Sequence, residues 1–530
     1  MAQTFEDITK EVVNRFLQNI LFLDDNAYLT DKNEKNAFDA GQITSVFAKY
    51  GKLCTVFAPH SENDLGHCAT LFAKSDVIVL DWFLKLELDP VDNEEDDDED
   101  DEPRGKYTKD LIKGIIEDAK DEKLKLVVVY TGDGTKLYDI IKEIQSIVSE
   151  NSNFETKEED FRVSSSNVLI LVRVKSNGEG HNQLKYNKDL QSKIVDYEKL
   201  PIFISEEFAN LVNGLLPNYA LAAISSIRNS TSNILGVFSK DIDTAFMGHF
   251  VSIPDSNDAI TMLSKIFGAA VTDLVDANNY DIKLWMDKWL QHNYAEPFTT
   301  KIAQKQVNIT FDILKRVVES PIIEFKNKLK EAGLTIKGEE DSLKKDAIQL
   351  FDVNANDAAN YKLARLMQHS DLFSSSKRRR LTMGTIVKFQ KVNESDWSFL
   401  LCIQQSCDSV RIGQGEERTF LFLPLVQGIK GEAVVVGENH HLIVDSKSYS
   451  IELYKFSPRN GSDAQIIAQP LPQDNQYVFT DITGKQFFWV AELKEMFAQH
   501  IVSAYASQLS RVGIDNSEWI RLVGKKKSSN

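Results

Sequence analysis

Residues 19–28 read NILFLDDNAY, and this stretch decides the fold of the first part of the chain. Its apolar run is uninterrupted, which is typical of a strand buried on both faces of a parallel sheet. Asp24 and Asp25 follow the run directly, although two adjacent carboxylates repel each other unless a cation or hydrogen-bond donors hold them. The stretch therefore predicts a buried strand that ends in a charged site.

Four further apolar runs follow before residue 180, and segments with helical spacing of apolar residues separate them. The runs are CTVFA at 54–58, DVIVL at 76–80, KLVVVY at 125–130 and NVLILVRV at 167–174. The helical segments are 34–51, 67–75, 107–120 and 135–150. Strands that alternate with helices predict an α/β fold with a doubly wound, parallel, five-stranded sheet over residues 1–180.

The rest of the chain changes its pattern twice. From 181 to 374 apolar residues recur every three or four positions, which predicts an all-α domain with a helix beginning at Ser205. Residues 375–382 hold the basic run KRRR and are predicted to form a solvated linker. From 383 to 530, runs rich in β-branched and aromatic residues predict a β-rich domain, an antiparallel sheet or small barrel, that ends in a helix.

Composition argues against several classes of protein. The chain has 530 residues with 42% hydrophobic content, enough for more than one domain, and its apolar runs are too short to cross a bilayer. The formal charge of −18 argues against general affinity for nucleic acids. An acidic insertion at 91–104 is predicted to be a solvated loop or a docking site for a basic partner. Four cysteines without a CxxC pair, and a polar N-terminus, predict a cytoplasmic protein.

Polar residues follow the later strands at the same end as Asp24 and Asp25. Asp81 follows the third run, Thr131 the fourth and Lys175 the fifth. Because ligands of an open parallel sheet collect beyond the carboxyl ends of its strands, we expect these side chains to converge. The acids suit Mg²⁺, which would also relieve their mutual repulsion. Asp81 is then expected to attack a phosphoryl group, while Lys175 pairs with that group and Thr131 donates a hydrogen bond to it.

Other sets of residues are weaker candidates. Cys54, His60, His67 and Cys68 match no standard zinc-binding spacing and are predicted to belong to the core. The KRRR run is more typical of a solvated segment than of a phosphate contact, because it is isolated in an acidic chain. Asp76 precedes its strand, so we expect it at the opposite edge of the sheet.

The order of residues on successive strand ends resembles the receiver domain of two-component response regulators. The resemblance covers residues 15–180 and rests on an Asp-Asp pair followed by Asp81, Thr131 and Lys175. It implies that Asp81 is the phosphoacceptor and that a sensor histidine kinase is the partner that supplies the phosphoryl group.

The same resemblance implies a set of metal ligands. Asp24, Asp25 and Asp81 are expected to hold Mg²⁺ together with the backbone carbonyl of Phe83. Two positions depart from the usual receiver pattern. A serine follows Lys175 where receivers usually have proline, and a valine stands three positions before it in place of the aromatic switch residue.

The helical segment 206–250 resembles one that accompanies divergent receivers of bacterial anti-phage two-component systems. This chain resembles their buffering component, which lacks a toxic effector and intercepts phosphoryl groups, so a sister effector regulator is a second expected partner. Two alternatives stay open. One is an effector whose C-terminal domain hydrolyses a substrate or binds nucleic acid on phosphorylation, and the other is a non-phosphorylated docking scaffold. No enzymatic activity beyond phosphoryl acceptance and self-dephosphorylation is expected.

Overall fold

The computed structural model of the chain consists of two compact units. One comprises Met1–Phe298 and Asn308–Thr335, and the other comprises Thr299–Val307 and Ile336–Asn530. The acidic insertion predicted at 91–104 lies outside the described residues. The structure describes residues 3–28, 38–87, 105–119, 123–149, 153–176, 188–252, 256–302, 305–319, 347–352, 357–373, 378–390, 396–428, 433–437, 440–445, 450–459, 464–471 and 476–509.

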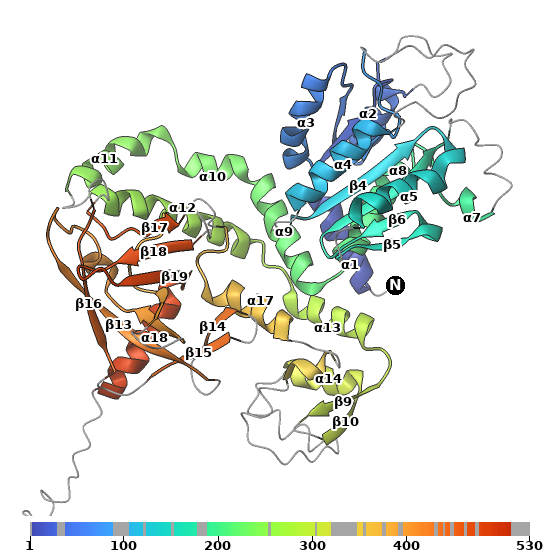
Figure 1. Cartoon of the computed structure of the whole chain (residues 1–530). Coiled ribbons are helices and arrows are strands. Elements are labelled where there is room, and N and C mark those ends of the chain that lie inside the picture. Colours follow the sequence, from blue (N-terminus) through green and yellow to red (C-terminus); the bar gives the residue numbers. More distant parts are fainter. Residues whose placement is uncertain are drawn as a thin grey trace, which may run out of the picture. The chain divides into compact units, whose positions relative to one another are not determined.

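A parallel sheet lies at the centre of the first unit (Figure 1). Its five long strands coincide with the five apolar runs of the sequence and lie in the order β2-β1-β3-β4-β7. Helices cover both faces, and β3, β4 and β7 are buried along their whole length, which explains why their apolar runs are uninterrupted. The strands are β1 (Asn19–Leu23), β2 (Leu53–Phe57), β3 (Val77–Leu80), β4 (Lys125–Thr131) and β7 (Val168–Lys175).

The prediction of a five-stranded sheet is wrong, because three short strands extend it. β5 (Glu155–Lys157) and β6 (Arg162–Ser164) form an antiparallel hairpin, and β6 pairs with the first half of β7. β8 (Ile194–Val195) pairs in parallel with the end of β7. Strands of two or three residues carry too little alternation to be recognised from the sequence. Together β6 and β8 occupy the outer edge of β7, which would otherwise offer unpaired backbone groups.

One face of the sheet is covered by α3 (Glu62–Lys74), α4 (Lys106–Asp118) and α5 (Leu137–Val148). Their apolar side chains share a core with one set of alternating strand residues, including Ile78 and Val127. α3 begins at Ser61, which caps the N–H of Asp64, so the capping residue marks where the chain leaves β2.

The opposite face is covered by helices from both ends of the unit. α1 (Phe5–Phe16), α2 (Ala40–Lys49), α8 (Leu200–Leu211), α9 (Leu215–Asn229) and α13 (Ile282–Asn293) contribute to a core with strand residues such as Phe22 and Val128. The segment predicted as a separate all-α domain thus supplies part of the core of the first unit. Its boundary at 181 stays a prediction.

The prediction that a helix begins at Ser205 is wrong. α8 begins at Leu200 with Pro201 in its first turn, a position where proline needs no hydrogen-bond donor. Ser205 lies inside the helix, and its hydroxyl donates to the carbonyl of Pro201 at 2.8 Å. The acids after Ser205 therefore lie past the first turn.

Further elements complete the segment between the two sheets. It also contains a two-stranded sheet, which its helical pattern did not indicate, because the sequences of β9 and β10, FTTKI and KQVNI, hold no uninterrupted apolar run. No helix among the described residues is long and apolar enough to cross a membrane. The elements are α7 (Lys188–Gln191), α10 (Thr231–Val237), α11 (Asp243–Ser252), α12 (Ser256–Ala277), β9 (Phe298–Ile302), β10 (Lys305–Ile309) and α14 (Phe311–Glu319).

The second unit is built around an antiparallel sheet, as the β-branched and aromatic runs predicted. The strand order is β14-β15-β13-β12-β11-β19-β18-β17, with β16 also paired to β13. Two cores flank the sheet, and α18 (Glu495–Leu509) packs into one of them. α17 (Asp357–Gln368) precedes the sheet. The strands are β11 (Thr385–Gln390), β12 (Trp397–Cys402), β13 (Arg418–Gln427), β14 (Ala433–Gly437), β15 (His440–Val444), β16 (Glu452–Phe456), β17 (Gln469–Leu471), β18 (Gln476–Thr480) and β19 (Gln486–Glu492).

Over the residues that the structure describes, the basic segment before β11 is solvated only in part: Arg378 and Arg380 are exposed, as its composition predicted, but other residues of the segment are not. Arg379 and Leu381 are buried, with exposed fractions of 7% and 1%. The N–H of Leu381 donates to the carbonyl of Ile466, and the carbonyl of Arg379 accepts from the N–H of Ala468, both at 2.9 Å. This backbone pairing holds the segment against the sheet.

Candidate functional site

The first acid of the site, Asp24, follows β1 directly and is buried. Its backbone N–H donates to the carbonyl of Phe57 on β2 at 3.2 Å, so strand pairing fixes the start of the loop. Oδ1 of Asp24 accepts a hydrogen bond of 3.0 Å from the N–H of Asn26. The turn after β1 therefore holds this carboxylate in one orientation, with its second oxygen available to another donor.

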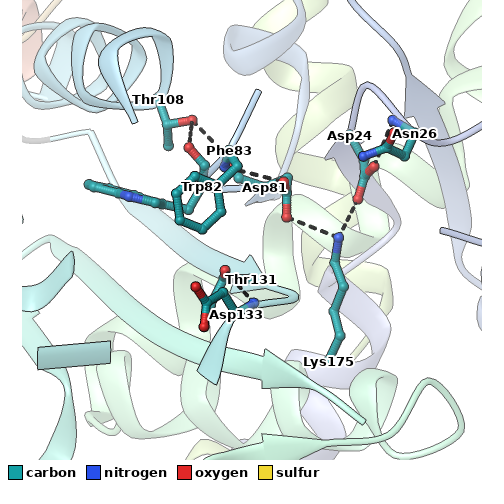
Figure 2. Close-up of polar contacts among 9 residues, drawn as sticks. All are labelled: Asp24, Asn26, Asp81, Trp82, Phe83, Thr108, Thr131, Asp133 and Lys175. Carbon is teal, nitrogen blue, oxygen red and sulfur yellow. Dashed lines mark hydrogen bonds and ion pairs between the residues drawn. The ribbon is translucent and has the colours of Figure 1, made fainter. Parts of the chain in front are cut away.

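Lys175 joins the ends of β1, β3 and β7 (Figure 2). Its Nζ donates to Oδ2 of Asp24 at 2.6 Å and to Oδ1 of Asp81 at 2.9 Å. Asp81 follows β3, and its N–H donates to the carbonyl of Leu23 at 2.8 Å, which extends the pairing of β3 with β1. The ammonium is 2% exposed and lies 5.4 Å from the centre of the Phe38 ring. The structure therefore brings three of the predicted site residues into direct contact.

The charges of the site do not balance around this one ammonium. Burial raises the pKa of Asp24 to about 6, even though Lys175 attracts its charge. Burial and the charges of Asp81 and Asp24 raise the pKa of Asp25 to about 7. For Lys175, burial opposes the charged form, but the two carboxylates outweigh it and raise the pKa above its ordinary value. Three carboxylates around one ammonium leave an excess of negative charge.

Thr131 ends β4 and is fully buried beside the acids (Figure 2). Its Oγ1 accepts a hydrogen bond of 3.1 Å from the N–H of Asp133. Within the described part of the chain, this hydroxyl makes no hydrogen bond to Asp81 or Lys175. Thr131 therefore lies on the strand end where the sequence placed it, but its contacts in this structure are local.

The loop after Asp81 is held by residues that the sequence reasoning missed. The N–H of Phe83 donates to Oδ2 of Asp81 at 3.2 Å. The hydroxyl of Thr108, on α4, donates to the carbonyls of Asp81 at 2.8 Å and Trp82 at 3.1 Å (Figure 2). Gly105 precedes α4 with φ +78°, and a Cβ there would lie 2.6 Å from Cε2 of Trp82. The signal for this loop that the sequence offered was a glycine three residues before a threonine at the start of a helix.

The chemistry of the acids fits a hard cation. Oδ1 of Asp25 is buried without a hydrogen-bond partner, and carboxylate oxygens are ligands that Mg²⁺ prefers. Among the described residues, no group of three or more His, Cys, Asp and Glu side chains is gathered closely enough to hold a metal ion. The four predicted ligands, Asp24, Asp25, Asp81 and the carbonyl of Phe83, thus remain predictions, with the unsatisfied oxygen of Asp25 as the structural observation in their favour.

Asp76, Cys54 and Cys68, which the sequence offered as weaker candidates for a site, have the surroundings of residues that stabilise the fold. Asp76 lies at the amino end of β3, where Oδ2 accepts from the N–H groups of Gln18 and Asn19 and Oδ1 pairs with Arg228 at 2.8 Å. Burial raises the pKa of the Cys54 thiol to about 12, and burial together with the charge of Asp64 raises that of Cys68 to about 11. Both thiols are unreactive in these surroundings, although Cys54 is only partly buried. The prediction that this set belongs to the core is wrong for His60 and His67, which are exposed.

The comparison with models of protein families finds a match in the first part of the chain. Residues 16–180 match the family model of the response receiver domain, which agrees with the predicted resemblance over 15–180. No curated protein and no solved structure matches the chain. The match supports a response-regulator role in two-component signalling. Receiver domains generally bind Mg²⁺ at the phosphorylation site and typically interact with histidine kinases.

Proposed function

We propose that this protein is a phosphoacceptor response regulator in which Asp81 receives a phosphoryl group from the phosphohistidine of a sensor histidine kinase. The observation that supports it best is the ammonium of Lys175, shared by Asp81 and Asp24 at the carboxyl end of the sheet. A buried structural ion pair needs one acid for one base. This lysine faces an excess of acids within residues that match the receiver family.

The transfer requires only the phosphohistidine as co-reactant. An oxygen of the Asp81 carboxylate forms a bond to phosphorus, and the P–N bond breaks with its electron pair left on the imidazole nitrogen. The products are an acyl phosphate on Asp81 and a free histidine on the kinase. Self-dephosphorylation follows when water cleaves the acyl phosphate and releases inorganic phosphate.

Each neighbouring residue has a role in this reaction. Lys175 contacts the attacking carboxylate, which supports a role in which its ammonium pairs with a phosphoryl oxygen once Asp81 is phosphorylated. Thr131 ends the adjacent strand and offers a hydroxyl for a second oxygen. Asp24, Asp25, Asp81 and the carbonyl of Phe83 would hold Mg²⁺, which when bound neutralises charge on the phosphoryl oxygens.

For the biological role we propose a buffer that takes up phosphoryl groups in an anti-phage two-component system and so competes with a sister effector regulator. Two observations support storage over onward signalling. Val172, at the position of the usual aromatic switch, is buried in the core and has no ring to rotate. The outer edge of β7 is paired with β6 and β8, so it offers little free backbone to a partner.

The test of phosphoacceptance is incorporation from acetyl phosphate, measured by intact mass with and without Mg²⁺. Wild type is expected to gain one phosphoryl adduct in the presence of Mg²⁺, and Asp81→Asn is expected to gain none. Asp133→Asn is the matched control, because that acid follows the neighbouring strand and, among the described residues, its side chain accepts hydrogen bonds from the local turn at Thr135 alone. An adduct on Asp81→Asn, or none on wild type even with a cognate kinase, would contradict the proposal and favour a docking scaffold.

A second measurement separates the buffer from the effector. Limited proteolysis and size-exclusion chromatography are carried out on the full chain before and after phosphorylation. The buffer predicts unchanged oligomeric state and unchanged cleavage within residues 383–530. A large change in either, or toxicity in cells that requires residues 383–530, would favour the effector.

A further inference from the structure

The ammonium of Lys175 can donate three hydrogen bonds, and the two acids of the site take two of them. Among the described residues, no third acceptor pairs with it. Instead the ammonium lies over the ring of Phe38, 5.4 Å from the ring centre. Because Lys175 is only 2% exposed, water has little access to this cation. The ring therefore covers a side of the ammonium that solvent would otherwise occupy.

Phe38 is itself held firmly and is 4% exposed. The side chain of Asp39, the next residue, accepts a hydrogen bond of 2.8 Å from the N–H of Gln42 and so caps α2, which fixes the backbone beside Phe38. The ring of Phe22, on β1, lies 5.7 Å from the Phe38 ring, and that of Tyr197 lies 5.8 Å away, edge to face. The ring that covers the ammonium thus has little freedom to move.

Tyr197 comes from the chain beyond the residues that match the receiver family. It lies between β8 and α8, and β8 places Val195 beside Lys175 in the register of the sheet. The hydroxyl of Tyr130, on β4, donates to the carbonyl of Val195 at 2.6 Å, and its ring lies 6.2 Å from that of Tyr197. The segment after the matched residues therefore supports the ring that faces the ammonium.

We propose that Phe38 is a positioning residue of the phosphoacceptor site, which holds the ammonium of Lys175 beside Asp81 and keeps water from it. The inference rests on the proposed function. A ring face attracts a cation without accepting a strong hydrogen bond, so the donors of the ammonium stay available for carboxylate and phosphoryl oxygens. An ammonium without a water shell also interacts more strongly with the charge that develops on those oxygens.

A second ring of the same cluster shows what packing alone requires. Phe47, on α2, is fully buried, and its ring lies 5.6 Å from that of Phe22. It shares the core of Phe38. In the described part of the chain, however, no ammonium or guanidinium lies over its ring. Phe47 is therefore a matched control for the effect of removing an aromatic side chain from this core.

The test is the rate constant of phosphoryl incorporation from saturating acetyl phosphate with Mg²⁺, followed by intact mass on the full chain. Phe38→Leu is expected to lower this rate constant by about tenfold, because a small displacement of a positioned charge weakens its effect on the transition state. Phe47→Leu is expected to keep the rate constant of wild type, and Phe38→Tyr, which retains the ring, is expected to stay close to it. Unfolded protein lowers the final extent of incorporation and not its rate constant, so lost stability does not imitate the effect.

The inference is overturned if Phe38→Leu reacts as fast as wild type, or if Phe38→Leu and Phe47→Leu slow equally, because equal losses would show a general effect of the core. Phe38→Tyr that is as slow as Phe38→Leu would also overturn it, since the ring face would then have no role. Wild type that takes up no phosphoryl group, even from a cognate kinase, would overturn the proposed function and this inference together. A reactive wild type with an equally reactive Phe38→Leu overturns this inference alone.

Circular dichroism checks that each variant is folded. If Phe38→Leu does not fold, Tyr197→Leu removes the support of the ring and leaves Phe38 in place. Incorporation is then expected to slow less than tenfold but measurably, and a wild-type rate constant in that variant would overturn the inference.

Discussion

Two aspartates flank the same four-residue strand, β3, and they have almost the same exposure, 8% for Asp76 and 6% for Asp81. At the amino end, Asp76 accepts two backbone hydrogen bonds and pairs with one arginine. At the carboxyl end, Asp81 shares the ammonium of Lys175 with a second acid, while a third acid lies close enough to be raised in pKa.

The difference between these two ends shows that partners, and not burial, set what a buried acid can do. Asp76 has a donor for each oxygen and pairs with Arg228, and the charges of Lys52 and Lys125 also attract it, so it is a structural link between the sheet and α9. Asp81 lies among carboxylates that together exceed the available positive charge, and such excess charge is typical of sites that bind cations or phosphoryl groups.

The largest expected effect comes from removing the shared cation. Lys175→Met should lower the free energy of unfolding by about 4 kcal/mol, because it leaves buried carboxylates without their cation. The urea midpoint of the first unit measures this. Lys10→Met is the control, since Lys10 pairs with Glu206 at 3.4 Å and both side chains are about half exposed, and a loss below about 1 kcal/mol is expected there. Equal losses in the two variants would contradict the comparison.

Removing the contacts of Asp76 at the amino end of β3 should lower the free energy of unfolding but leave phosphoryl incorporation at Asp81 intact. Asp76→Ala removes the acceptor of two backbone N–H groups and the partner of Arg228, which is itself one-third exposed, so we expect a loss of about 3 kcal/mol. Asp76→Asn retains an acceptor and should lose less. Phosphoryl incorporation from acetyl phosphate should persist in both variants at a temperature where they are folded. A folded Asp76→Asn protein that takes up no phosphoryl group would show that the two ends are coupled.

A smaller effect is expected from the loop that holds Asp81. Gly105→Ala places a Cβ 2.6 Å from the Trp82 ring at φ +78°, and should cost about 2 kcal/mol from the left-handed backbone and the clash. Phosphoryl incorporation should also slow, because Trp82 adjoins the acceptor. Gly114→Ala, in the same helix with open space around the new Cβ, should instead stabilise by about 0.5–1 kcal/mol. Thermal unfolding of both variants shows whether the loss of stability comes from backbone strain at Gly105 or from a general intolerance of α4 to substitution.

The smallest effect tests the excess charge directly. Asp25→Asn removes a carboxylate whose ionised form is disfavoured by burial and by two neighbouring acids, so we expect a gain of roughly 1 kcal/mol without Mg²⁺ at pH 7.5. Addition of Mg²⁺ should raise the melting temperature of wild type more than that of the variant. A variant that is less stable than wild type without Mg²⁺ would argue that Asp25 is a structural acid like Asp76.

Much of the fold could be predicted from local pattern, and the exceptions have physical reasons. The five long strands were evident because burial on both faces removes polar residues from them. The sequence pattern did not indicate β5, β6 and β8, because strands of two or three residues are too short to show a regular spacing of apolar residues. A serine followed by acids is typical of a helix start and so predicts one at Ser205, whereas Pro201 is the stronger signal.

The site was predictable in its residue types but not in its contacts. Parallel strands bring their carboxyl ends to one edge, so Asp24, Asp81 and Lys175 were expected near one another. That Thr108 and Gly105 hold the acceptor loop was not visible, because Thr108 is 27 residues from Asp81 in the chain. The KRRR run was assigned to solvent on composition, and only packing against Trp489 and Tyr477 explains why Arg379 is buried.

The sequence by itself determined which segments become buried strands and which polar residues end them, since both follow from the spacing of apolar residues along the chain. Only the tertiary structure decided which partners those residues have. Lys175 is 151 residues from Asp24 and 94 from Asp81, and no local pattern reports a contact over that separation. Because the partners of a buried charge decide whether it is structural or reactive, the distinction between Asp76 and Asp81 belongs to the fold.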